Sequence, residues 1–95
     1  MKRYEIRRAN GQPVVIVSLD AFNDVLSTVT VCPLTSRIHP EWRTHITVKT
    51  GDRDADIMVE QIRTLSKSRL GKRLGVLSKH DAATLRRVIT ELYGE

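Results

Sequence analysis

Residues 57–75, IMVEQIRTLSKSRLGKRLG, decide the fold because they join an apolar strand to a cationic surface. Ile57, Met58, Val59 and Ile62 predict a strand, and Gly71 and Gly75 close the connection that follows it. No Asp or Glu occurs from residue 61 to residue 80, whereas that segment carries Arg63, Lys67, Arg69, Lys72, Arg73 and Lys79. A half-buried strand joined to so many cations indicates a fold that presents basic groups to a polyanion.

Upstream of this stretch the sequence predicts mainly strands. Residues 4–7 predict a short edge strand that ends at an Asn10-Gly11 turn, and the aliphatic run 13–19 (PVVIVSL) predicts a strand covered on both faces. Residues 28–34 and 44–49 alternate in polarity, which is typical of half-buried strands. We expect residues 20–26 to form a loop or a single helical turn and residues 51–56 to form a charged hairpin connection.

Downstream, residues 72–77 predict a final short strand and Ser78 begins the clearest helix. Ser78 followed by Asp81 is a helix-start signal, and the apolar residues of one helical face are Ala82, Leu85, Val88, Ile89 and Leu92. We expect that face to lie on the sheet. Residues 1–95 therefore predict a single, mainly β domain of the α+β class, closed by a C-terminal helix.

Length and charge limit the possible partners. A chain of 95 residues is one domain, small enough that self-association would help to bury apolar surface. Its net charge of +5 favours nucleic acid, a membrane surface or an acidic protein. No apolar run approaches the roughly 20 residues that cross a bilayer, and the opening MKRYEIRR lacks a signal-peptide core. We therefore expect a cytoplasmic protein without a membrane partner.

Polar residues at strand ends are the candidates for chemistry. Cys32 is the only cysteine, which excludes an internal disulfide and a cysteine-based zinc site, and we expect it to be a buried apolar residue. No glycine-rich phosphate loop, HExxH or GxSxG motif occurs, and we expect no cofactor or metal. The candidates that remain are Thr35, Ser36, Arg37 and His39 after one strand, and Glu60, Arg63 and Thr64 around another. Such groups can hold a phosphodiester and move protons, so RNA cleavage by the neighbouring 2′-hydroxyl is chemically possible.

Three blocks of sequence make the chain resemble the MazF/PemK family of toxins from bacterial toxin–antitoxin modules. They are residues 11–18 (GQPVVIVS), residues 28–36 (TVTVCPLTS), and the segments 59–64 and 67–75 of the opening stretch. The resemblance implies a small SH3-like barrel with a helical appendage, a homodimer, and metal-independent, sequence-selective cleavage of single-stranded RNA that leaves a cyclic phosphate. It also implies control by an acidic antitoxin, in line with the basic charge of this chain. Operator DNA, bound together with that antitoxin, is a further candidate partner.

The resemblance also suggests which residues act. It implies a catalytic role for Thr35, while Gln12 stands where the family has an arginine that stabilises charge on the scissile phosphate. Arg37 or Arg8 is our candidate for the missing cation. Glu60 is a candidate base, or else it satisfies backbone groups beside a dimer interface. The candidate RNA-binding residues are Ser36, Arg37, His39, Arg63, Lys67 and Arg69, with Trp42 able to stack on a base.

Two alternatives stay open. The start MKRYEI and the segment 33–38 are also similar to CcdB, a gyrase-poisoning toxin of the same fold, and this resemblance implies gyrase binding by the C-terminal residues Tyr93, Gly94 and Glu95. The other alternative is a nucleic-acid-binding toxin homologue that has lost activity at Gln12. Of the remaining histidines, His45 alternates with Ile46 and is expected to face solvent.

Overall fold

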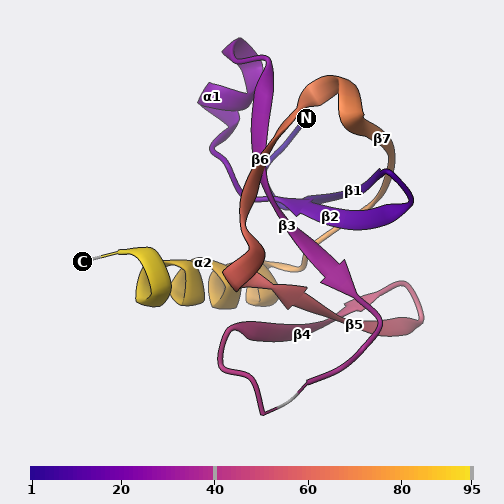
Figure 1. The fold of residues 1–95 in the computed structure, drawn as a ribbon, viewed down its shortest axis with the longest axis vertical. Coiled ribbons are helices and arrows are strands. Elements are labelled where there is room, and N and C mark those ends of the chain that lie inside the picture. Colours follow the sequence, from indigo (N-terminus) through magenta and orange to yellow (C-terminus); the bar gives the residue numbers. More distant parts are fainter. Residues whose placement is uncertain (40, 95) are drawn as a thin grey trace.

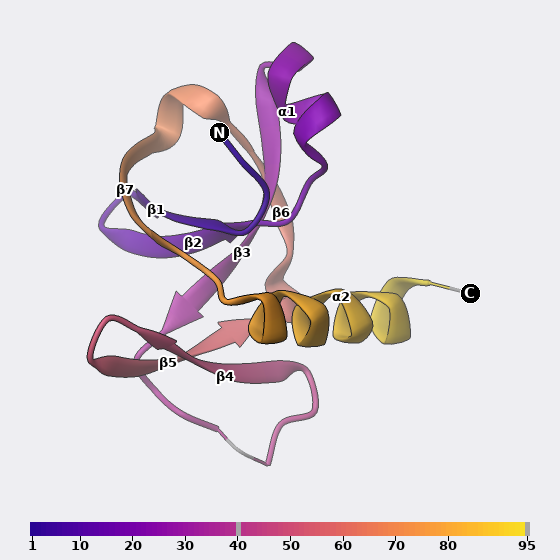
Figure 2. The same cartoon turned by 180° about the vertical axis from the view of Figure 1, so that it is seen from behind.

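The computed structural model describes residues 1–39 and 41–94, and these form a curled antiparallel sheet with a C-terminal helix (Figure 1). Figure 2 shows the same arrangement from behind, with α2 lying along one side of the sheet. The elements in chain order are β1 (Glu5–Ala9), β2 (Gln12–Ile16), α1 (Asp20–Val25), β3 (Thr28–Thr35), β4 (His45–Thr50), β5 (Arg53–Met58), the 3-10 turn η1 (Val59–Gln61), β6 (Arg63–Ser66), the 3-10 turn η2 (Lys67–Arg69), β7 (Leu70–Val76) and α2 (Lys79–Tyr93). The predicted mainly β fold with a C-terminal helix is confirmed.

Strand β3 holds the sheet together because it exchanges partners along its length. The strand order is β4-β5-β3-β2-β1-β7, and β6 pairs with the first half of β3. Pro33 is the last residue of β3 opposite β2, and Leu34 is the first opposite β5. The partner that changes is on the other edge of β3 from β2, because Val31 is the last residue opposite β6 and Leu34 is the first opposite β5. The end of β3 therefore lies where the two parts of the curled sheet meet.

The β1–β2 hairpin has the turn that its sequence predicts. Asn10 and Gly11 form a two-residue loop between Ala9 and Gln12, with φ angles of 52° and 80°, as a type I′ turn requires. The prediction that the first strand lies at an edge is wrong, because β1 also pairs with β7. That partner comes from the other end of the chain, and no local pattern announces it.

Strand β2 is buried on both faces, as its aliphatic run predicted. Val15 belongs to the main core with β4, β5 and α2, whereas Val14 and Ile16 belong to a second core with Val29 and Val31. All three β2 residues are fully buried. Each such side chain contributes about 1.5–3 kcal/mol, so β2 is a rigid support for what its ends carry.

Helix α2 begins as predicted, with the Asp81 amide donating to Ser78 Oγ at 3.1 Å. Ala82, Leu85 and Val88 are buried against the main core, beside β4 and η1. Leu92 was expected on the same face, yet it is 40% exposed, because the last turn of α2 extends past the sheet. No helix in the described part of the chain has the length and apolarity to span a bilayer.

The stretch that follows β4 differs from its prediction in two places. The expected connection over residues 51–56 is only the Gly51-Asp52 turn, and Arg53 already opens β5. The expected strand from Ile57 onward is broken by η1. Six steps of chain, from Ile57 to Arg63, lie opposite only three steps of β3, and the 3-10 turn takes up the excess.

Residues 20–26, expected to be a loop or one turn, contain the six-residue helix α1.

Candidate active site

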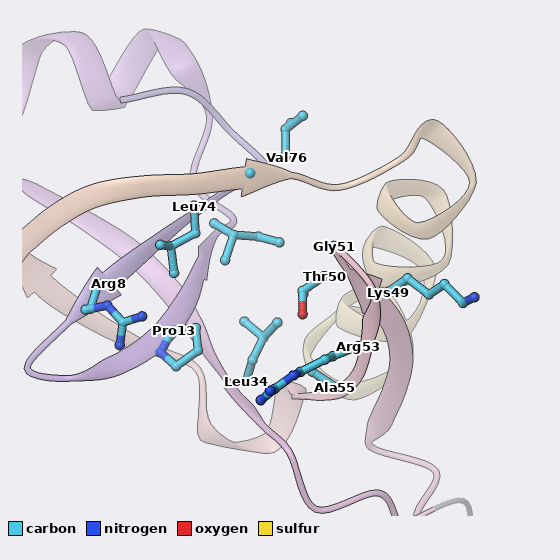
Figure 3. Close-up of a pocket in the computed structure, with 12 residues that line it drawn as sticks. Arg8, Pro13, Leu34, Lys49, Thr50, Gly51, Arg53, Ala55, Leu74 and Val76 are labelled. Atoms are coloured by element: carbon cyan, nitrogen blue, oxygen red, sulfur yellow. The ribbon is translucent and has the colours of Figure 1, made fainter.

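A cleft opens where β2 begins, β3 ends and β5 begins. Its volume is about 380 Å³, and its polar lining includes Gln12, Thr35, Ser36 and Arg53. A neighbouring cavity of about 390 Å³ continues it between the β4–β5 hairpin and β7 (Figure 3). The two share the lining residues Pro13, Leu34, Thr50, Arg53 and Ala55. We call this pair of cavities the strand-end cleft.

The register of the strands brings Gln12 and Thr35 together. Val14 lies opposite Pro33, so the first residue of β2 and the last residue of β3 come alongside each other two positions further on. The Gln12 Nε2 amide donates to the Leu34 carbonyl at 3.4 Å, which is a long hydrogen bond. Thr35 Oγ1 accepts from the Arg37 amide at 3.2 Å, which leaves its own proton for donation. Both groups can therefore turn donors toward an anion in the cleft.

Glu60 lies elsewhere, on η1, in a network centred on His45. His45 Nδ1 is 3.2 Å from Asp56 Oδ2, and His45 Nε2 is 3.3 Å from Glu60 Oε2. The expectation that His45 faces solvent is wrong, because its side chain is only 2% exposed. Asp56 is fully buried and needs donors, and the ring of His45 supplies one of them. We call Asp56, His45, Thr47 and Glu60 the His45 network.

The carboxyl groups of this network have shifted pKa values. Burial pushes the pKa of Asp56 up, but hydrogen bonds from the His39 amide, the Thr47 hydroxyl and His45 more than offset this and hold the pKa below its ordinary value. For Glu60 burial also raises the pKa, and hydrogen bonds that include Thr44 and His45 lower it further than burial raises it. Both groups are therefore carboxylates at neutral pH.

An aromatic cluster borders the network on the β3–β4 connection. The rings of His39 and Trp42 are stacked, with centroids 4.8 Å apart, and Trp42 meets His45 edge to face at 4.8 Å. Trp42 is 48% exposed, so one part of its ring stays available to solvent. The structure thus places His39 in a supporting position behind an exposed indole.

The predicted RNA-binding cations do not gather at the strand-end cleft within one chain. Arg63 lies on β6, while Lys67 and Arg69 lie on η2, where the Lys67 amide donates to Ser27 just before β3. Thr35 is at the other end of that eight-residue strand, about 23 Å away along it. Arg37 follows the strand but does not line the cleft. Lys67 and Arg69 therefore form a separate basic region, which we call the η2 surface.

Other predicted residues have structural surroundings. The Tyr93 hydroxyl donates to the Val59 carbonyl at 3.2 Å, although the residue is 53% exposed; Gly94 ends α2, and Glu95 lies outside the described residues. Cys32 is fully buried, and burial together with the negative charge of Glu60 raises the pKa of its thiol to about 12. As expected, it is a core residue rather than a nucleophile.

Sequence reasoning missed Arg53 as a site residue. It fell inside what was interpreted as a charged connection. The pair Gly51-Asp52 is a signal for a two-residue hairpin, and that signal would have placed Arg53 at the start of a strand facing the end of β3.

Residues 5–93 match the family of PemK-like, MazF-like toxins of type II toxin–antitoxin systems. The chain belongs to this family. It is 40% identical over 72 residues to the endoribonuclease MazF of Staphylococcus saprophyticus, which covers 70% of this chain. The match spans only 60% of that relative's length.

Solved structures share the fold of this toxin. An endoribonuclease from a mycobacterial species has a TM-score of 0.90 at 23% identity, covering 99% of this chain and 91% of that one. A mycobacterial endoribonuclease in complex with its cognate antitoxin has a TM-score of 0.90 at 22% identity, covering 99% of this chain and 95% of that one. A MazE–MazF complex from Deinococcus radiodurans has a TM-score of 0.86 at 22% identity, covering 99% and 96%. These likenesses establish the curled-sheet toxin fold.

Proposed function

We propose that this toxin is a metal-independent, sequence-selective endoribonuclease that cuts single-stranded RNA in the strand-end cleft. The observation that carries the proposal is the meeting of Gln12, Thr35 and Ser36 in one open cleft of a chain that belongs to the MazF-like family. The similarity to the staphylococcal endoribonuclease supports the same activity. We expect it to act in the cytoplasm, where its RNA would be.

The proposed reaction is transesterification within the RNA. The 2′-oxygen attacks phosphorus as the bond from phosphorus to the 5′-oxygen breaks, which gives a 2′,3′-cyclic phosphate and a 5′-hydroxyl. The Gln12 amide and the Thr35 hydroxyl would donate to the non-bridging oxygens as negative charge builds on them. In the open cleft the proton of the 2′-hydroxyl passes to water, and water gives a proton to the leaving 5′-oxygen. Because Glu60 lies outside the cleft in the single chain, the mechanism assigns it no proton transfer.

Cleavage of a labelled single-stranded RNA in the presence of EDTA tests this function. We expect products with 2′,3′-cyclic ends, and a rate at least 100-fold lower for Thr35→Ala, the scale of losing one donor to a developing oxyanion. The matched control is Thr84→Ala, because Thr84 is a partly exposed threonine of α2 whose hydroxyl donates to the His80 carbonyl of the same helix. Intact RNA with the wild-type protein, or an undiminished rate with Thr35→Ala, would overturn the proposal.

We also propose that the toxin forms a homodimer and is held by an acidic antitoxin. A mycobacterial endoribonuclease of the same fold is solved with its cognate antitoxin, and the net charge of +5 of this chain favours an acidic partner. Operator DNA would be bound by the complex of the two proteins.

Exposed apolar residues on and around α1 support self-association. Phe22 is 55% exposed and Val25 is 76% exposed, with Leu19 and Leu26 beside them at 49% each. A second copy seated there would remove this apolar patch from water. We expect the double variant Phe22→Ser/Val25→Ser to shift the mass measured by light scattering from dimer toward monomer, whereas Leu92→Ser on α2 should not. An unchanged dimer would exclude α1 from the interface.

A further inference from the structure

We propose that Arg53, at the start of β5, supplies the positive charge that stabilises the scissile phosphate in the strand-end cleft. The inference rests on the proposed ribonuclease function and names the cationic residue that the function needs. Gln12 can donate a hydrogen bond but carries no charge, so a phosphorane bound by Gln12 and Thr35 alone would keep its full negative charge.

Arg53 is placed where that charge is required. It lines both cavities of the cleft, with Gln12, Thr35 and Ser36 in one and Arg8 and Lys49 in the other. Figure 3 shows its side chain extending from β5 toward Leu34, on the side where Pro13 lies. Pro13 and Leu34 are the chain neighbours of Gln12 and Thr35. Arg53 therefore lines the same cavity as the two proposed donors, from β5, whereas they come from β2 and β3.

Arg53 makes no ion pair within the described part of the chain. Among the described residues that line the Thr35 cavity, Arg53 is the one cation, and no described carboxylate lies within ion-pair distance of it. Arg7 and Arg73 differ in this respect, since both pair with Glu5 at 3.1 and 3.2 Å. Asp54 also borders the cleft, but as the next residue on a strand its side chain belongs to the opposite face of β5.

The two arginines that the sequence suggested are less well placed. Arg8 Nη1 donates to the Gly11 carbonyl at 3.1 Å, and Arg8 lines only the neighbouring cavity. Arg37 lines neither cavity, although its amide is bonded to Thr35. Of these three arginines, Arg53 is thus the one that lines the same cavity as Thr35.

The hairpin that carries Arg53 holds its backbone firmly. Arg53 pairs with Thr50 across a two-residue turn, and the ladder continues to the pair His45 and Met58. Three positions along β5 is the fully buried Asp56, which accepts from the His39 amide at 2.7 Å and from Thr47 Oγ1 at 2.6 Å. A catalytic side chain needs a rigid backbone of this kind if it is to stabilise the transition state more than it stabilises the bound substrate.

The chemistry of arginine suits the task. Its planar guanidinium can donate two parallel hydrogen bonds to phosphate oxygens and stays charged at any pH used for an assay. Because it acts on charge that builds during the reaction, its removal should lower kcat and kcat/KM by similar factors, with little change in KM. A residue that only helps to bind RNA would raise KM instead.

Cleavage kinetics of Arg53→Ala in EDTA test the inference. We expect kcat to fall about 100-fold or more, Arg53→Lys to recover part of the rate, and the double variant Arg53→Ala/Gln12→Arg to recover most of it by returning a guanidinium from the β2 side. The control is Arg86→Ala, because Arg86 is an exposed arginine of α2 away from the cleft. Circular dichroism melting confirms that each variant is folded.

The outcomes separate this inference from the function on which it rests. A wild-type protein that leaves RNA intact overturns both. A wild-type protein that cleaves, with Arg53→Ala within threefold of its kcat, overturns the role of Arg53 alone, as does a loss confined to KM or a loss that Arg86→Ala reproduces.

Discussion

The strand-end cleft and the His45 network contain similar polar side chains, but these side chains have different partners in the two regions. In the His45 network, Asp56 is fully buried and its oxygens accept from His39, Thr47 and His45. In the cleft, Gln12 has one long hydrogen bond and Arg53 has no carboxylate partner among the described residues. Polar groups that satisfy one another stabilise a fold, whereas polar groups that face an open cleft remain available to a ligand.

The largest expected contrast is in stability. Asp56→Ala should lower the free energy of unfolding by about 3 kcal/mol, because it leaves the buried His45 ring and the His39 amide without their acceptor. Gln12→Ala should lower it by less than about 0.5 kcal/mol, as is usual for a partly exposed residue with few partners. Urea unfolding followed by circular dichroism measures both. Equal losses would mean that the two regions do not differ in the way described.

Acid should weaken the protein through the His45 network. The pKa values of Asp56 and Glu60 are lowered in the folded protein, so the unfolded chain binds protons more readily. Their stabilisation is fully present above the ordinary carboxyl range near pH 4 and is lost as the pH falls through the folded values. Unfolding measured from pH 6 to pH 2.5 should show this loss, and Asp56→Asn should flatten part of it. A variant curve parallel to that of the wild type would contradict the assignment.

Trp42 contacts both the buried His45 network and solvent, so it links the two kinds of environment. Its exposed ring is supported from behind by His39 and His45. If it stacks on a base, Trp42→Ala should weaken RNA binding by about 1–3 kcal/mol, and Trp42→Phe by much less. Fluorescence anisotropy with a labelled RNA and the Thr35→Ala protein, which should bind without cutting, gives the affinities. Unchanged binding of Trp42→Ala would remove the indole from the RNA path.

The η2 surface should matter for salt dependence more than for the rate of cutting. Each phosphate contact adds about −0.7 to the slope of log K against log salt for a single strand. Removing Lys67 and Arg69 together should therefore make the slope shallower by about 1.4 if both contact phosphates, while kcat stays near its wild-type value. The same anisotropy assay at several salt concentrations measures this. An unchanged slope would show that RNA does not reach the η2 surface.

Glu60→Gln is expected to have the smallest effect on the reaction. Glu60 lies on η1 and bonds to His45, away from Thr35 in the single chain. We expect kcat to fall by less than tenfold, whereas a general base contributes about 100- to 10,000-fold. A loss of that larger size, measured in the EDTA assay, would restore Glu60 to the chemistry and would imply that another copy brings it to the cleft.

Local chemistry made much of this fold predictable. Asn10-Gly11 predicted a hairpin, the run from Pro13 predicted a strand covered on both sides, and Ser78 with Asp81 predicted the start of α2. Of the residues that line the strand-end cleft, those at strand ends, such as Thr35 and Ser36, could be named from the sequence. What sequence could not show depends on pairing between distant segments.

Arg53 and His45 illustrate this limit. Arg53 could be recognised as a cleft residue only from the pairing of β5 with the end of β3. The burial of His45 depends on Asp56, a carboxylate eleven residues away. Alternation alone marked His45 as facing solvent, because a period of two separates the faces of a strand without telling which of them is covered.

The turn of the β4–β5 hairpin has a consequence for how this toxin can change. Thr50 and Arg53 face each other across Gly51 and Asp52, and φ at Gly51 is 70°. Gaining or losing one residue there would shift the pairing by one and move each side chain of β5 to the other face. A loss would put Asp54, and a gain would put Asp52, where Arg53 now lies, so this wall of the cleft would carry a negative charge. The length of this turn thus sets the sign of the charge that the start of β5 presents to the strand-end cleft.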